Sequence, residues 1–206
     1  MNPFDQDKEM DKAQLWDMLV ERDSLAFVNQ DWDLVKNDFV AEHFMGIHAH
    51  KESNPDLWKI SFPNLTSYQK EWLKQAKDFS NDSWTEKPYE ILLKVTYLDE
   101  IEICEDKAIL HKKFSGFAEK TNGEKITFSW QTIYRCVKIN DKWKISGFTG
   151  YLPLNVKKGN LVQTPAKLVP IGANQHLTAG PYSPVLNVNS TQLVVISGQA
   201  AIEKSG

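Results

Sequence analysis

Three histidines lie close together in the first quarter of the chain: His43, His48 and His50. Alternate residues of a strand share a face, so His48 and His50 would place both rings on one side. A histidine pair can bind a metal ion, but a site needs a third ligand, which the spacing does not supply. We therefore expect no metal site and no cofactor. The histidines are either a solvated polar rim or, with His48 facing a pocket, the source of a general base, because imidazole titrates near neutrality.

A second candidate for acid–base chemistry is Asp33, which follows Trp32. A carboxylate held beside an indole in an apolar pocket has a raised pKa, which suits a base that abstracts a proton next to a carbonyl. The alternative is structural, because Asp31 and Asp33 also suit the start of a helix, where the helix dipole favours acids.

Large aromatic residues are the candidate walls of a pocket. Tyr97 alternates with Ile91, Leu93 and Val95, so its hydroxyl is predicted to reach a cavity on their face. Aromatics on the covered face of a sheet are also ordinary core residues, and both interpretations stand. The predicted pocket residues are Trp32, Tyr97, Trp130, Tyr134 and Phe148.

These side chains need a sheet to position them, and residues 107–153 predict one. Three apolar-rich runs are separated by Asn122-Gly123 and Asn140-Asp141, which tolerate the positive φ of tight turns. The middle run alternates from Ile126 to Tyr134, which is typical of a sheet with one covered face. The stretch therefore predicts an antiparallel meander.

The preceding chain predicts the layer that covers this sheet. Apolar residues recur every three or four positions from Met10 to Asn29, which indicates an amphipathic helix, and Asp31 caps a second, short helix. Thr66 is the predicted N-cap of a third helix that extends to Phe79. The remaining segments are a short strand or bend at 42–50, an aromatic loop at 58–63 and a strand at 89–104.

Composition restricts the possible partners. Of 206 residues, 41% are hydrophobic, and the net charge is −3. No basic cluster interleaved with aromatics is present, so we expect no nucleic-acid binding. No apolar run is long enough to span a membrane, and the acidic start lacks a signal-peptide core, so we expect a cytoplasmic protein without a membrane partner.

The order of helix, short helix, loop, third helix and curved sheet, ending in the Lys142–Ile145 run, resembles the nuclear transport factor 2-like superfamily, and within it the SnoaL-like or polyketide-cyclase branch. The resemblance covers residues 8–153. It implies an α+β fold in which a curved antiparallel sheet and N-terminal helices form a cone around an apolar pocket. It also implies a homodimer.

The tail resembles the opening of a Rid-family (YjgF, reactive intermediate deaminase) domain. The matching positions are Gly180, Pro181, Tyr182, Ser183, Ser197, Gly198 and Gln199. Members of that family hydrolyse enamines and imines, and their signature includes an arginine and a glutamate from the second half of the domain, beyond Gly206 of this chain. The expected organisation is a cone domain at 1–153, a linker or arm at 154–173 and a truncated Rid-like β-hairpin segment at 174–206.

Three functions follow from these patterns. The first is a pocket domain that binds an apolar or carbonyl-bearing small molecule, with or without weak acid–base catalysis by His48 or Asp33. The second is a non-catalytic dimerisation or assembly domain, which requires that aromatic side chains fill the pocket. The third is a truncated form of a two-domain enamine or imine deaminase. The sequence leaves open whether the protein is an enzyme.

Overall fold

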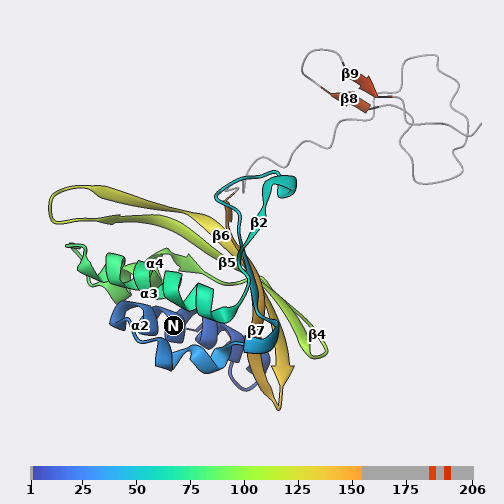
Figure 1. Ribbon diagram of the computed structural model, residues 1–206, viewed down its shortest axis with the longest axis horizontal. Helices are drawn as coiled ribbons and strands as arrows, with labels where there is room; N and C mark the ends of the chain where they lie inside the picture. The colour runs from blue at the N-terminus through green and yellow to red at the C-terminus, as the bar shows by residue number, and fades with distance from the viewer. Residues whose placement is uncertain (1, 155–185, 189–192, 196–206) are drawn as a thin grey trace, which may run out of the picture. The chain divides into compact units, whose positions relative to one another are not determined.

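The computed structural model describes residues 2–154, 186–188 and 193–195 (Figure 1). The chain divides into two units, Met1–Leu154 and Asn155–Gly206. In the second unit, β8 (Leu186–Val188) pairs antiparallel with β9 (Leu193–Val195). The Rid-like motif and, apart from Leu154, the expected linker lie outside the described residues. The proposed Rid-like segment and the domain boundaries therefore stay predictions.

The first helical stretch contains a change of helix type. It consists of α1 (Met10–Trp16), a π-helical turn η1 (Asp17–Arg22) and α2 (Asp23–Asn29), and Gln30 ends it in the left-handed conformation. A π-turn adds a residue to the repeat and so rotates every later side chain around the helix axis. As a result Leu25, one of the apolar residues of this predicted amphipathic helix, is 44% exposed, while Ser24 is buried.

Short 3₁₀ turns follow this helix: η2 (Trp32–Leu34), η3 (Lys36–Asp38) and η4 (Ala41–His43). Asp31 caps η2, as predicted, because its carboxylate accepts a hydrogen bond of 3.0 Å from the Asp33 amide. Trp32 stacks on Phe39 with ring centroids 5.3 Å apart, which fixes the turns against the core.

The next segment forms a small hairpin of β1 (Met45–His48) and β2 (Lys59–Phe62), with η5 (Pro55–Leu57) between them. The prediction of an aromatic loop at 58–63 was wrong, because residues 59–62 complete the edge of the sheet beside β1. Of the short strand or bend predicted at 42–50, the structure has a strand at 45–48.

Two further helices complete the helical layer. α3 (Leu65–Asn81) is capped by Asn64, whose side chain accepts a hydrogen bond of 2.9 Å from the Ser67 amide, so Thr66 is not the N-cap. α4 (Pro88–Val95) lies where a strand was predicted. Pro88 at the first helical position and the spacing of Ile91 and Val95 favour a helix, and this signal overrides the short alternation.

The predicted meander is confirmed. β5 (Lys107–Glu119), β6 (Lys125–Ile139) and β7 (Lys142–Pro153) pair antiparallel in order, and the shorter β3 (Thr96–Tyr97) and β4 (Ile101–Cys104) pair with β5. Gly123, Asn140 and Asp141 have positive φ in the two tight turns, as their residue types indicated.

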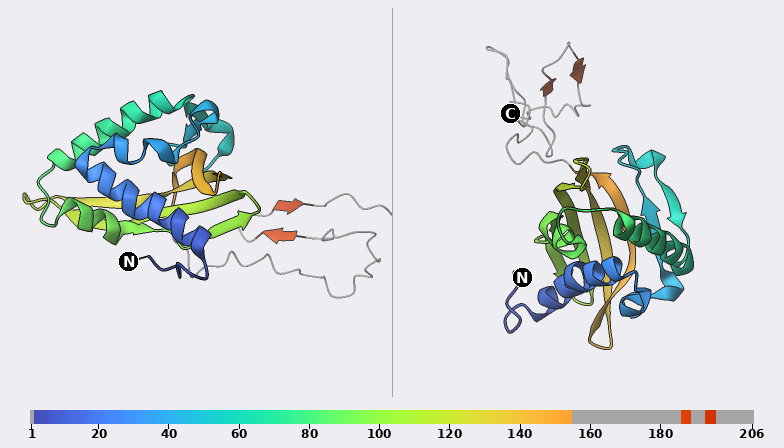
Figure 2. Two further views of the ribbon diagram at one scale, coloured as in Figure 1. Left: turned by 90° about the horizontal axis from the view of Figure 1, so that it is seen from below. Right: turned by 90° about the vertical axis from the view of Figure 1, so that its left-hand side faces the viewer.

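The main sheet is mixed rather than wholly antiparallel. Its strand order is β2-β1-β7-β6-β5-β3, and β1 runs parallel to β7. The helices lie against one face of this curved sheet (Figure 2). The prediction of an antiparallel sheet was therefore wrong at one junction, because the chain enters β1 from η4 in the direction of β7. The α+β fold with N-terminal helices is confirmed.

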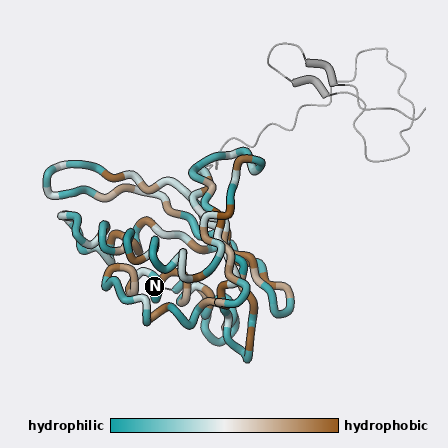
Figure 3. The backbone as a smooth tube through the Cα atoms, viewed as in Figure 1, coloured by the Kyte–Doolittle hydropathy of each residue, from teal (hydrophilic) through white to brown (hydrophobic). Residues whose placement is uncertain are grey.

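The core lies between the helices and the inner face of the sheet, and hydrophilic residues are frequent in the turns (Figure 3). In the part of the chain that the structure describes, no helix combines the length and apolar character needed to cross a membrane.

Candidate functional site

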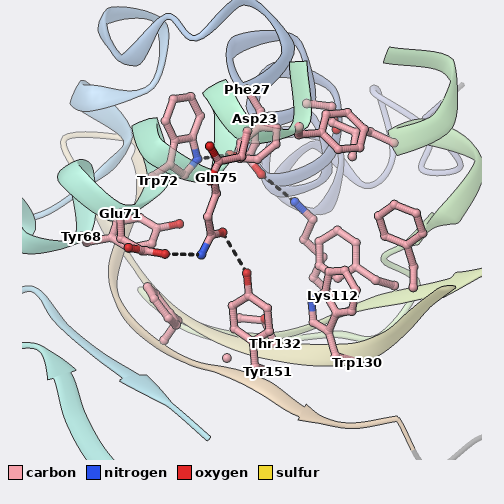
Figure 4. Close-up of a pocket in the computed structure, with 18 of the residues that line it drawn as sticks. Asp23, Phe27, Tyr68, Glu71, Trp72, Gln75, Lys112, Trp130, Thr132 and Tyr151 are labelled. Atoms are coloured by element: carbon pink, nitrogen blue, oxygen red, sulfur yellow. Dashed lines mark hydrogen bonds and ion pairs between the residues drawn. The ribbon is translucent and has the colours of Figure 1, made fainter. Parts of the chain in front are cut away.

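A cavity of about 390 Å³ lies between α2, α3 and α4 on one side and the inner face of β5, β6 and β7 on the other (Figure 4). Its walls are mostly aromatic. The aromatic residues that line it are Phe27, Phe62, Tyr68, Trp72, Phe79, Trp84, Phe114, Phe128, Trp130, Tyr134, Phe148 and Tyr151. The volume is in the range of small-molecule sites, roughly 300–1,000 Å³.

An ion pair lies in this aromatic wall. The Nζ of Lys112 lies 2.7 Å from Oδ2 of Asp23, and the indole Nε1 of Trp72 donates to Oδ1 of the same carboxylate at 3.3 Å (Figure 4). The Lys112 side chain is 2% exposed and that of Asp23 27%. Lys112 Nζ also lies 5.2 Å from the centre of the Phe114 ring. The ammonium is therefore removed from water, and its charge is balanced by Asp23. Burying such a pair costs desolvation free energy that an apolar residue at the same position would not cost.

Local structure explains why these two charges face inward. Asp23 is the first residue after the π-helical turn, which sets the face of α2 that meets the sheet. Lys112 lies on β5 two residues from Leu110 and from Phe114, so the strand alternation directs it to the covered face.

A second polar group crosses the cavity from α3 to β7. The hydroxyl of Tyr151 donates to Oε1 of Gln75 at 2.8 Å, and Nε2 of Gln75 donates to Oε1 of Glu71 at 2.9 Å (Figure 4). Burial raises the pKa of Tyr151, so its hydroxyl stays protonated at neutral pH. The chain of hydrogen bonds fixes the direction of the Gln75 amide, whose NH₂ group faces Glu71.

A bulge in the sheet turns Tyr151 inward. The pairing of β6 with β7 shifts between Gln131 and Ile133, which places an extra β7 residue opposite Thr132. Tyr151 has φ 54°, unusual for a residue with a side chain. Both Gly150 and Tyr151 therefore line the cavity.

Two tyrosine hydroxyls add further polar groups. Tyr68 of α3 and Tyr134 of β6 both line the cavity. Burial raises the pKa of both hydroxyls well above the usual value, so neither ionises near neutral pH. Both can donate to or accept from a ligand.

His48 lies next to the cavity but is not part of its lining. Its ring stacks on Tyr151 with centroids 4.1 Å apart and lies 3.9 Å from the ring of His50, whose backbone amide donates to His48 Nδ1 at 3.0 Å. The two rings do lie together, but not through strand alternation, because β1 ends at His48 and His50 lies in the following turn with φ 52°. Burial, and then the charge of His50, lowers the pKa of His48.

The remaining predicted site residues lie elsewhere. Asp33 has a side chain that is 79% exposed, and Lys36 pairs with it at 2.9 Å. Trp32 is buried in the core and does not line the cavity. Tyr97 is 51% exposed, because α4 interrupts the strand whose alternation was used to place it. Trp130, Tyr134 and Phe148 line the cavity together.

No metal centre is formed by the residues that the structure places. Within 2–154, 186–188 and 193–195, no group of three or more His, Cys, Asp and Glu side chains is arranged to hold an ion. His43 is exposed on η4 and is not part of the pair of neighbouring rings formed by His48 and His50.

A buried carboxylate lies outside the cavity. Asp38 of η3 has its Oδ2 3.3 Å from Nε of Arg22, yet neither atom has a hydrogen-bond partner of good geometry. Burial raises the pKa of Asp38 to about 6, against the opposing effect of the Arg22 charge.

Comparison with known proteins gives a likeness of fold. No family model matches the chain, and no curated protein matches it. An NTF2-like protein of unknown function from Shewanella oneidensis MR-1 shares 14% identity over 68% of this chain and 98% of its own, with a TM-score of 0.43. Aln2 from a Streptomyces species shares 8% identity over 69% and 91%, with a TM-score of 0.49. A protein with a cystatin-like fold from Nostoc punctiforme shares 11% identity over 69% and 91%, with a TM-score of 0.44.

These structural neighbours include proteins described as NTF2-like. Identities this low say nothing about ligand or reaction. The matches contain nothing that bears on a Rid-type domain.

Proposed function

We propose that the domain formed by residues 2–154 binds a small, mainly apolar molecule in the cavity between its helices and its sheet. The observation that carries the proposal is the cavity itself, about 390 Å³ with mostly aromatic walls. Sites for small organic ligands have this composition, in which apolar walls supply affinity and a few fixed polar groups set orientation.

The polar groups are arranged to orient a bound molecule. The ion pair of Asp23 and Lys112 lies in one part of the wall, and the chain of Tyr151, Gln75 and Glu71 crosses another (Figure 4). A carbonyl or hydroxyl on the ligand can bond to the hydroxyl of Tyr68 or Tyr134. Acid–base catalysis is not part of the proposal, because His48 and Asp33 are absent from the cavity lining.

The open cavity favours binding over the assembly alternative. A purely structural domain gains stability when large side chains fill its interior, since each void sacrifices packing contacts. Here the aromatic side chains surround the space rather than occupy it. A homodimer remains compatible with the binding proposal and stays a prediction.

The proposal is tested by isothermal titration with 2-naphthaleneethanol, a neutral molecule with an aromatic body and one hydroxyl. Wild type is compared with Thr132→Phe, which places a ring in the cavity from the middle of β6, and with Thr127→Phe, its control at an exposed position of the same strand. We expect binding to wild type and to Thr127→Phe, and none to Thr132→Phe. Equal binding by all three proteins, or by none, contradicts the proposal.

A further inference from the structure

The charges in the cavity lining do not balance. Among the described residues, four carboxylates line it, those of Asp23, Glu71, Asp78 and Asp82, against the single ammonium of Lys112. Lys112 neutralises Asp23, and Lys120 pairs with Asp82 at 2.9 Å. Glu71 and Asp78 form no ion pair with any residue that the structure places. The lining therefore carries two negative charges without a matching cation.

Glu71 is the better placed of the two. It is half-buried, whereas Asp78 is exposed. Its Oε1 accepts one hydrogen bond from the Gln75 amide, which Tyr151 holds in position, and this neutral donor leaves the negative charge in place. A carboxylate that receives only one amide hydrogen bond retains further acceptor positions for a ligand.

The other basic groups among the described residues form no ion pair with Glu71. His48 interacts electrostatically with Glu71, but burial and the neighbouring His50 lower the pKa of His48 and favour the neutral ring at pH 7. Lys51 lies over Trp130, with Nζ 5.9 Å from the ring centre, and is not part of the lining. Lys70 and Lys74 of α3 are exposed and also lie outside the lining.

The aromatic walls favour a cation as well. The face of an aromatic ring attracts a positive charge, most strongly when the pair is desolvated. Lys112 already uses this interaction with Phe114. An anionic ligand would meet the opposite situation, because it would have to displace Asp23 to reach an ammonium that is 2% exposed.

From this charge distribution we infer that the ligand is a cationic amphiphile: an ammonium group that pairs with Glu71, joined to an apolar body that lies among the aromatic walls. The inference rests on the proposed function and specifies the ligand class of the same site. Asp78, exposed and unpaired among the described residues, contributes attraction at longer range.

The test compares three molecules with the same body at pH 7: 2-naphthylethylamine, 2-naphthaleneethanol and 2-naphthaleneacetate. A charge-assisted hydrogen bond is worth about 1.5–3 kcal/mol, so we expect the amine to bind at least about tenfold more tightly than the alcohol. The acetate should bind most weakly. Added salt should reduce the preference for the amine and leave the affinity for the alcohol unchanged.

Two variants assign the effect to one carboxylate. Glu71→Gln should remove the preference for the amine while it keeps the affinity for the alcohol, and the control Glu102→Gln, at an exposed position of β4, should behave as wild type. If the alcohol or the acetate binds as tightly as the amine, or if Glu71→Gln keeps the preference, the inference is wrong and the binding proposal stands. If none of the three molecules binds, both fall.

Discussion

Lys112 and Asp23 are 89 positions apart in the sequence, and their side chains meet at 2.7 Å in the wall of the cavity. One comes from β5 and the other from the first residue of α2. The pair joins the sheet to the helical layer, and the two partners differ in burial. Lys112 is 2% exposed, while Asp23 is 27% exposed and also accepts a hydrogen bond from Trp72.

This difference predicts an asymmetric response to mutation. Asp23→Asn leaves a buried ammonium without its counter-charge and should lower the free energy of unfolding by about 3 kcal/mol. Lys112→Met leaves the Asp23 carboxylate, which keeps its hydrogen bond from Trp72 and is partly exposed. This variant should lower the free energy of unfolding by only about 1 kcal/mol. Urea denaturation measures both values.

The matched control is Lys36→Met, which breaks the exposed pair with Asp33. It should change the free energy of unfolding by no more than about 0.5 kcal/mol. Equal losses in Asp23→Asn and Lys112→Met would contradict the predicted asymmetry. Losses as small as that of the control would show that the pair does not stabilise the contact between the layers.

Asp38 predicts a pH-dependent stability of defined sign. Burial raises its pKa from 3.8 to about 6, so between these values the folded protein binds more protons at this group than the unfolded chain does. Its contribution to stability therefore falls as pH rises from 4 to 7. The free energy of unfolding of Asp38→Asn should therefore rise by about 2–3 kcal/mol relative to that of wild type between pH 4 and pH 7.

Urea denaturation of wild type and Asp38→Asn at pH 4, 5, 6 and 7 measures this difference. The prediction would be contradicted if the difference in free energy of unfolding stayed constant across the series, or if wild type became the more stable protein as pH rose. Either result would mean that Asp38 is not a buried, protonated carboxyl at pH 5.

His48 offers a direct titration. Burial, and then the charge of His50, lowers its pKa below the ordinary 6.5, so the ring should be neutral at pH 7 and charge only in more acidic solution. The stability that it contributes is complete above pH 6.5 and is lost as pH falls through the lowered pKa. NMR titration of the ring protons gives the value, and His50→Ala should raise it. A pKa at or above 6.5 would contradict the stacked, desolvated ring.

The meander was predictable because its cause is local. Alternation along 126–134 and the Asn-Gly and Asn-Asp turns specify antiparallel strands without reference to the rest of the chain. The parallel pairing of β1 with β7 depends instead on residues about 100 positions apart in sequence, such as Ile47 and Thr149, and no short-range signal reports it.

Predicted and observed positions of the site residues differ for equally physical reasons. Tyr97 was assigned to the cavity by alternation from Ile91. Residues 88–95 are helical, so the two-residue alternation of a strand does not extend from Ile91 to Tyr97. The π-turn at 17–22 likewise rotated the following helix residues. One inserted or helical residue changes the face of every residue that follows.

The sequence did contain a signal for the pair that was missed. Asp23 follows the buried Leu15 and Leu19 at four-residue steps, so a carboxylate interrupts an apolar stripe. Lys112 interrupts the alternation of Ala108, Leu110 and Phe114 in the same way. A charge on each of two facing apolar surfaces is costly unless the two charges pair, and that argument would have placed them together.

The most direct test of the binding proposal uses the tryptophan side chains as reporters of ligand position. Trp72, Trp84 and Trp130 line the cavity, while Trp16 and Trp143 are buried away from it. The indole N–H resonances of ¹⁵N-labelled protein are followed by NMR as 2-naphthaleneethanol is added. Binding in the cavity predicts that the resonances of Trp72, Trp84 and Trp130 shift and saturate while those of Trp16 and Trp143 stay in place. Shifts confined to Trp16 or Trp143, or no shift at any concentration, would contradict it.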